Sequence, residues 1–185
     1  TACLCATDKA YPGYLLKRFL VLTDDLLVDV FTVEGEKKAV LDWTMHCRGG
    51  MTSNLAFKPA EPLGVENGYQ HLRSVQTAKG ADAAWLSFEK TPGEPLRIVL
   101  AGDEGSTIFS GAGIGYRLDD AVPFLIRRRM ESATAFVTVY DLGGRSQTGI
   151  RVERVPVKAD GAELHEWEGV GVKVSRGSSA VLIGM

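Results

Sequence analysis

Long apolar runs, a cysteine framework and a surplus of basic side chains are all absent from this 185-residue sequence. Because no run of about 18 apolar residues occurs, the sequence predicts no membrane-spanning helix. The formal net charge is −2, with 21 basic and 23 acidic side chains, and there is no basic helix or aromatic-rich RNA motif. We therefore expect neither a nucleic acid nor a membrane as partner. Any anion-binding site must be a local patch on a nearly neutral surface.

Cysteine is scarce, with three residues at Cys3, Cys5 and Cys47. At least one is unpaired, and Cys3 lies too close to Cys5 in sequence for a comfortable bridge across a strand. A structural zinc site needs about four ligands at characteristic spacing, and no Cys-x-x-Cys pair occurs. We expect no metal and no other cofactor.

The recurrent motifs of several enzyme classes are missing as well. The sequence has no Gly-x-Ser-x-Gly elbow, no His-Glu-x-x-His helix and no evident pair of nucleophile and base. The glycine-rich segment Gly111–Gly115 lacks the Lys-Ser/Thr pair of a phosphate-binding loop, and no helical pattern follows it. We interpret it as a turn between strands. The sequence predicts no catalytic residue within the chain.

Apolar runs near the start of the chain predict a meander of three strands. Tyr14–Thr23 and Leu26–Val33 are long enough for strands, and the Asp24-Asp25 pair between them is typical of a turn. A second turn is predicted at Glu34–Lys37, followed by an alternating strand at Lys38–His46. The alternation places Trp43 on the apolar face, and Asp42 and His46 on the other.

Short strands recur through the rest of the chain, after a long irregular connection at residues 48–67. They are predicted at Tyr69–Thr77, Ala83–Glu89, Leu96–Ala101, Ser106–Ser110, Phe124–Arg129, Ala133–Leu142, Thr148–Val157, Val170–Ser175 and Ser179–Ile183. Such spacing with Gly and Pro punctuation favours a sandwich or barrel. The sequence predicts an all-β fold, an antiparallel β-sandwich of the supersandwich type with little or no helix. We expect residues 1–185 to form a single domain.

A few polar residues are candidates for a binding site. Arg127 and Arg129 project to one face of their predicted strand, where two guanidinium groups suit carboxylate or sulfate oxygens. The alternatives are a solvated face or ion pairs within the chain. His46 and Arg48 lie where a strand meets a loop, a common place for functional residues, and Asp42 is positioned to orient the imidazole. The alternative for His46 is a structural role, which an isolated histidine has more often.

Two kinds of side chain need burial or a partner to be explained. Asp29 shares the face of apolar neighbours, where a lone carboxylate is costly, so the sequence predicts an ion pair with Lys17 or exposure of that face. Trp85 and Trp167 suit either stacking against a sugar or, as the favoured reading, anchoring in the core.

Five segments in order resemble the heparinase II/III-like polysaccharide lyases, in particular their alginate-lyase-like members. They carry a Tyr-x-Gly-x-x-x-x-Arg strand, a valine-aspartate strand, a Trp-x-x-His strand and two downstream segments: Tyr11–Arg18, Asp24–Phe31, Asp42–His46, Asn67–Leu72 and Pro123–Arg128. The family's catalytic Tyr and His come from an N-terminal helical toroid, and its β-domain closes the cleft. The family's His-x-His-x-Asp and His-Asn elements are missing here.

The resemblance implies a C-terminal β-domain, a fragment of a larger lyase that cleaves uronic-acid polysaccharide such as alginate or a glycosaminoglycan by β-elimination. We expect the chain by itself to be inactive. Its partners would be the helical toroid and an acidic polysaccharide, contacted by His46, Arg48, Arg127 and Arg129. The compartment implied is periplasmic or secreted. Two alternatives remain: a free-standing acidic-glycan-binding module, which is a carbohydrate-binding role, and a structural or oligomerisation domain.

Overall fold

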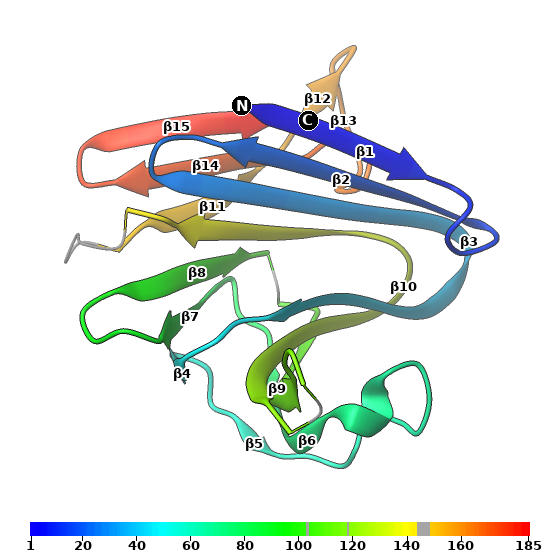
Figure 1. The fold of residues 1–185 in the computed structure, drawn as a ribbon. Helices are drawn as coiled ribbons and strands as arrows, with labels where there is room; N and C mark the ends of the chain where they lie inside the picture. Colours follow the sequence, from blue (N-terminus) through cyan, green and yellow to red (C-terminus); the bar gives the residue numbers. More distant parts are fainter. Residues whose placement is uncertain (103, 118, 144–148) are drawn as a thin grey trace.

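The structure, a computed structural model, is built almost entirely from antiparallel strands (Figure 1). It describes residues 1–102, 104–117, 119–143 and 149–185. Those residues hold one short 3-10 helix, η1 (Tyr69–His71), and no α-helix. The predicted all-β, antiparallel fold class is confirmed. Nothing in the described ranges has the helical length and apolar character needed to cross a membrane.

Ten strands form one large sheet, and the order of its main path is β1-β2-β3-β10-β8-β7-β4. Strand β9 pairs with β10, β6 with β9, and β5 with β6. The bounds are β1 (Ala2–Thr7), β2 (Tyr14–Leu22), β3 (Leu26–His46), β4 (Gly50–Ser53), β5 (Lys58–Pro59), β6 (Arg73–Lys79), β7 (Ala83–Glu89), β8 (Pro95–Ala101), β9 (Thr107–Ile114) and β10 (Ala121–Asp141).

The remaining strands form a three-stranded sheet and a small hairpin. The three-stranded sheet has the order β11-β14-β15, and the hairpin joins β12 to β13. The bounds are β11 (Arg151–Val155), β12 (Lys158–Ala159), β13 (Ala162–Glu163), β14 (Gly171–Arg176) and β15 (Ser179–Gly184). The strand predicted from Thr148 to Val157 is shorter, and Thr148 lies outside the described residues.

Strands β3 and β10 are each 21 residues long and pair over almost their whole length. The predicted turn at Glu34–Lys37 is therefore wrong, and so is the predicted break between Arg129 and Ala133. The register shifts where Glu131 and Ala133 face β3, and such an irregularity bends a strand without ending it. The ribbon thus passes from one layer into the other (Figure 1).

Absence of a side chain at Gly35 favours the bend. A Cβ there would lie 2.3 Å from the ring of Tyr14, which pairs with Gly35 and whose hydroxyl donates to the carbonyl of Lys37 at 2.8 Å. Gly35 was predicted to belong to a turn. It lies instead within a continuous strand, where the missing side chain leaves room for the Tyr14 ring.

The two faces of the sheet bury two main cores. One lies between the large sheet and the three-stranded sheet and includes Val28, Val30, Val137, Val139, Val172 and Val174. The other lies on the opposite face and is enclosed by the bent ribbon, with Leu41, Trp43, Leu86, Phe88, Ile98, Leu125 and Phe136. A third, smaller core around Val75, Phe124 and Ile126 lies under the long connection.

A buried carboxylate joins three strand segments across the second core. Asp29 is 1% exposed and accepts two hydrogen bonds from Arg18, at 2.9 and 2.6 Å, and one from Trp43 Nε1 at 3.2 Å. The predicted ion pair exists, but its partner is Arg18 and not Lys17. The register explains this, because Lys17 faces Thr32 on the opposite side of the sheet while Arg18 and Asp29 share one side.

Substitution of Arg18 by Met is expected to lower the free energy of unfolding by about 3 kcal/mol, because it leaves a buried carboxylate without its cation. Urea denaturation followed by circular dichroism measures this. The matched control is Lys17→Met on the other face of the same strand, expected to change stability by less than about 0.5 kcal/mol. Equal effects of the two substitutions would contradict a specific role for the Arg18–Asp29 pair.

Candidate functional site

His46 ends β3 and lies beside β10 and β9. Its ring centroid is 6.4 Å from that of Phe124, with which it is paired in register. A Cβ at Gly113 would lie 2.5 Å from His46 Nε2, so the imidazole occupies the space that a side chain on β9 would need. Burial of part of the ring lowers the pKa of His46, so the imidazole is neutral at neutral pH. It can donate or accept a hydrogen bond there.

The glycine-rich segment therefore has a different role from the predicted one. Gly111 and Gly113 lie within β9, not in a turn. A Cβ at Gly111 would lie 2.5 Å from the carbonyl oxygen of Arg73 and 2.9 Å from the ring of Phe124. Glycine is required at these two positions because neighbouring groups pack closely against the strand. The turn predicted at Gly111–Gly115 is therefore wrong for Gly111 and Gly113.

Arg48 lies two residues beyond His46, with half of its side chain exposed. It makes a two-pronged ion pair with Asp120: NH1 is 3.1 Å from Oδ1, and NH2 contacts Oδ2. Asp120 also accepts from the backbone N–H of Tyr116 at 3.1 Å. The bonds from Arg48, and then from Tyr116, hold the pKa of Asp120 below its usual range. The loop after β9 is thus fastened to the end of β3.

Asp42 lies on the same face of β3 as His46, as predicted, but it binds other groups. It accepts from Arg128 Nε at 2.8 Å and NH2 at 2.7 Å, and from the Tyr69 hydroxyl at 2.5 Å. The guanidinium group of Arg128 also lies over the rings of Tyr69 and Phe109, at 5.4 and 5.2 Å. Asp42 orients Arg128 and η1, rather than the imidazole.

Two tyrosines near these ion pairs have raised pKa values. Burial, followed by the hydrogen bond to Asp42, raises the pKa of Tyr69. Burial, followed by the charge of Asp29, raises the pKa of Tyr140 to about 12. Both phenols remain protonated at neutral pH, so neither is suited to act as a general base.

Arg127 points into the second core and is fully buried. Its NH1 donates to the carbonyl of Val137 at 3.0 Å and to Thr138 Oγ1 at 2.7 Å. Its guanidinium carbon lies 5.4 Å from the ring centroid of Trp43 and 5.3 Å from that of Phe136. The strand face was predicted correctly, but it is the inward face, and burial argues against the predicted contact of Arg127 with a sugar.

Arg129 lies on the same inward face and is 8% exposed. It donates to Ser106 Oγ at 2.9 Å, Thr134 Oγ1 at 2.5 Å and Glu166 Oε1 at 2.9 Å, and also to the carbonyl of Gly102. This matches the alternative of ion pairs within the chain. The structure does not bring Arg127 and Arg129 together with His46 and Arg48 on one surface, and substrate contact by any of the four stays a prediction.

The three tryptophans differ in their surroundings. Trp43 is 2% exposed and belongs to the core, as predicted. Trp85 is 43% exposed, so the favoured core role is wrong for this residue. Trp167 is partly buried and stacks on His165, with ring centroids 4.6 Å apart and planes 2° apart. Sequence alternation alone could not separate Trp85 from Trp43.

Metal binding has no evident basis in the described part of the chain, where no group of three or more His, Cys, Asp or Glu side chains is placed to hold an ion. The three cysteines are unbridged, and Cys3 and Cys5 are exposed.

Comparison with known proteins identifies the fold but gives no match to a family model or to a curated protein sequence. A solved structure of heparinase III matches all of this chain with a TM-score of 0.60 at 12% identity. A second heparinase III structure, with methylated lysines, gives 0.58 at 10%. This chain has the fold of a region of heparinase III. The heparan sulfate lyase HepC from Pedobacter heparinus also matches all of it, with a TM-score of 0.50 at 12% identity.

The match covers only part of each of these larger proteins. The chain spans 25% of the heparinase III chain and 26% of the HepC chain. At this low identity the likeness establishes the fold alone. The predicted relationship to the alginate-lyase-like members of the family stays a prediction.

His46 is expected to titrate below pH 6.5 in the folded chain, and NMR spectra of its ring protons recorded against pH, assigned with a His46→Gln variant, measure this. Because the folded pKa is below that of the unfolded chain, the unfolded state gains the proton first as pH falls. The stability linked to His46 is thus complete above about pH 6.5 and is lost as pH falls through the folded pKa. A midpoint above 6.5 would refute partial burial of the ring.

Proposed function

We propose that this chain is the β-domain of a polysaccharide lyase that cleaves a uronic-acid-containing polysaccharide by β-elimination. The observation that carries the proposal is the fold match, which covers 100% of this chain and about a quarter of heparinase III. The remaining three quarters of such an enzyme leave room for a helical partner domain that supplies the catalytic base. We also propose, from the family resemblance, that the parent enzyme is periplasmic or secreted.

The chemistry divides naturally between two domains. β-Elimination needs a base that removes the proton α to the carboxylate, and donors that neutralise the carboxylate as charge develops. Tyr69 and Tyr140 have raised pKa values and stay protonated, which makes them poor bases, while the lowered pKa of His46 keeps its imidazole neutral. In the proposed complex, the base comes from the helical domain and this chain supplies donors.

We assign those donors to the end of β3. Arg48 has half of its side chain exposed and is oriented by Asp120, so its remaining N–H groups can bind a carboxylate or sulfate of the chain being cleaved. His46 lies two residues before Arg48 and is also exposed. Its neutral imidazole can donate a hydrogen bond to the substrate without adding a charge. This end of β3 is the part of the β-domain that we place against the substrate cleft.

The proposal is tested by assaying the 185-residue chain and the complete gene product side by side for unsaturated uronate on heparan sulfate, chondroitin and alginate. The complete product should release unsaturated uronate from at least one polymer, and the chain alone should release none. Robust turnover by the chain alone would show that catalysis lies within it. A complete product inactive on every polymer would remove the lyase proposal.

Arg48→Ala in the complete product is expected to raise KM about tenfold, because a charged hydrogen bond to substrate is lost. The matched control is Arg117→Ala, which removes an exposed arginine paired with Asp119 at 3.2 Å on the neighbouring loop. The control should keep KM within about twofold. If Arg48→Ala behaves like the control, the end of β3 does not contact substrate.

A further inference from the structure

The outer part of the large sheet carries a cleft of about 500 Å³ that the proposed lyase role does not use. Register explains its position. On β7 and β8, the pairs Trp85–Val99 and Ser87–Arg97 face the same side of the sheet as the first core. The three-stranded sheet covers that side and ends at its edge strand β11. The cleft is the step between β11 and the surface of β4 and β7 that the described residues leave open.

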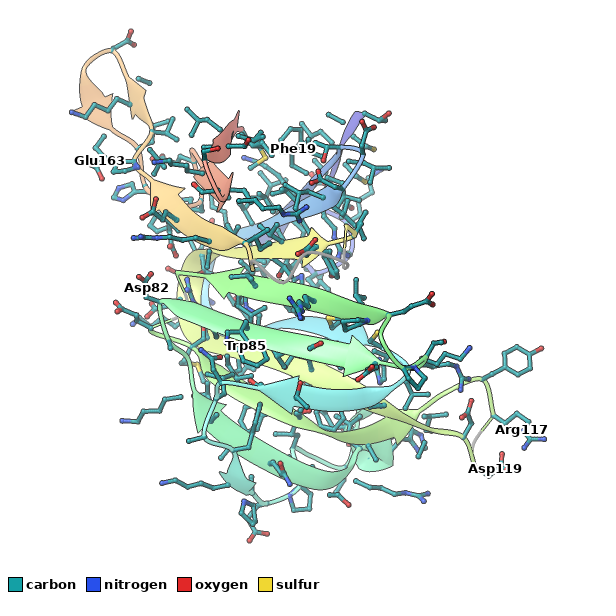
Figure 2. The ribbon with its side chains drawn as sticks, turned by 90° about the vertical axis from the view of Figure 1, so that its left-hand side faces the viewer. Phe19, Asp82, Trp85, Arg117, Asp119 and Glu163 are labelled. Atoms are coloured by element: carbon teal, nitrogen blue, oxygen red, sulfur yellow. The ribbon has the colours of Figure 1, made fainter. Side chains whose placement is uncertain are left out.

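Trp85 provides a flat aromatic surface in this cleft. It lies on β7 in the view of Figure 2, and 43% of it is exposed. A large indole left this exposed beside a concave surface is typical of a ligand contact, since it presents a broad apolar face while nearby polar groups fix orientation. Val99 and Ile150 extend the apolar floor, and Thr52 and Ser87 add hydroxyl groups.

Two arginines and one aspartate line the cleft. Arg97 and Arg151 both line it, from β8 and β11. The carboxylate in its lining, Asp141, is buried and is already bound by Arg176 at 2.5 Å. Arg151 is 77% exposed and shares a surface ion pair with Glu153, at 2.7 Å, which exchanges readily with a ligand anion. The cleft therefore combines a stacking surface, hydroxyl groups and two guanidinium groups.

From this combination we propose that the β7–β8–β11 cleft is a binding site for an acidic saccharide, separate from the end of β3. Trp85 stacks against the apolar face of a sugar ring, and Arg97 and Arg151 bind its carboxylate or sulfate groups. The proposal rests on side chains of this cleft and does not require that the parent protein be a lyase. A longer acidic chain bound here would be held by the β-domain away from the proposed catalytic cleft.

A saccharide fits these observations better than a nucleotide. Phosphate groups are commonly bound by the N–H groups of a helix N-terminus, and the described residues contain no α-helix. The glycine-rich segment of β9 is filled by neighbouring groups, as shown by Gly111 and Gly113. An open step along two strands, with hydroxyl and guanidinium groups spaced along it, suits an extended polymer.

The test is isothermal titration of the 185-residue chain with hexasaccharides of heparan sulfate and alginate, with neutral cellohexaose for comparison. At least one acidic hexasaccharide should bind, more weakly as salt is raised, and cellohexaose should bind far less. Trp85→Ala should weaken binding about tenfold and Arg151→Ala about threefold. Circular dichroism confirms that each variant is folded.

Matched controls separate this site from other surfaces. Trp167→Ala removes a tryptophan outside the cleft, and Arg117→Ala removes an arginine that, like Arg151, is exposed and paired with a carboxylate two residues away. Both should bind within about twofold of the parent chain. Undiminished binding by Trp85→Ala, no binding of any acidic hexasaccharide, or binding of AMP in their place would overturn the proposal.

Discussion

The buried carboxylate of Asp29 is the constraint on which the arrangement of this sheet depends. An unpaired carboxylate at this depth costs several kcal/mol, and the chain satisfies it from two directions. Arg18 reaches it from β2, and Trp43 reaches it from the far half of β3 itself. The first contact links β2 to β3. The second holds the two halves of one bent strand across the core, because residues 14 apart in sequence meet there.

The bend decides what each surface of the molecule can do. It carries the second half of β3 away from the three-stranded sheet, so that His46 and Arg48 lie beside β9 and the loop that follows it. The same bend turns the inward face of β10 toward Trp43. Arg127, which lies on that face, is therefore completely buried against the Trp43 ring. The three-stranded sheet then covers only part of the other face and leaves Trp85 in a cleft. Both candidate binding surfaces follow from one folded ribbon and one incomplete cover.

Individual residues show how far sequence reasoning reaches. Alternation correctly put Trp43 in the core and Arg127 with Arg129 on one face, because the period of two is a local property. It took Gly35 as part of a turn, and it gave Asp29 the wrong partner. Bends and partners depend on strands far away in sequence: Gly35 is needed for a tyrosine ring, and the ion pair follows from the register of β2 on β3.

By itself, the sequence determined the all-β antiparallel class, most of the strands and the side of its strand to which each residue points, because these depend on apolar alternation and on turn residues. Only the tertiary structure decided which side faces inward. Arg127 and Trp85 exchanged their expected places, one buried and one exposed, since burial depends on what the opposite layer covers. The same is true of the cleft beside β11, which exists only because two sheets of unequal width are packed together.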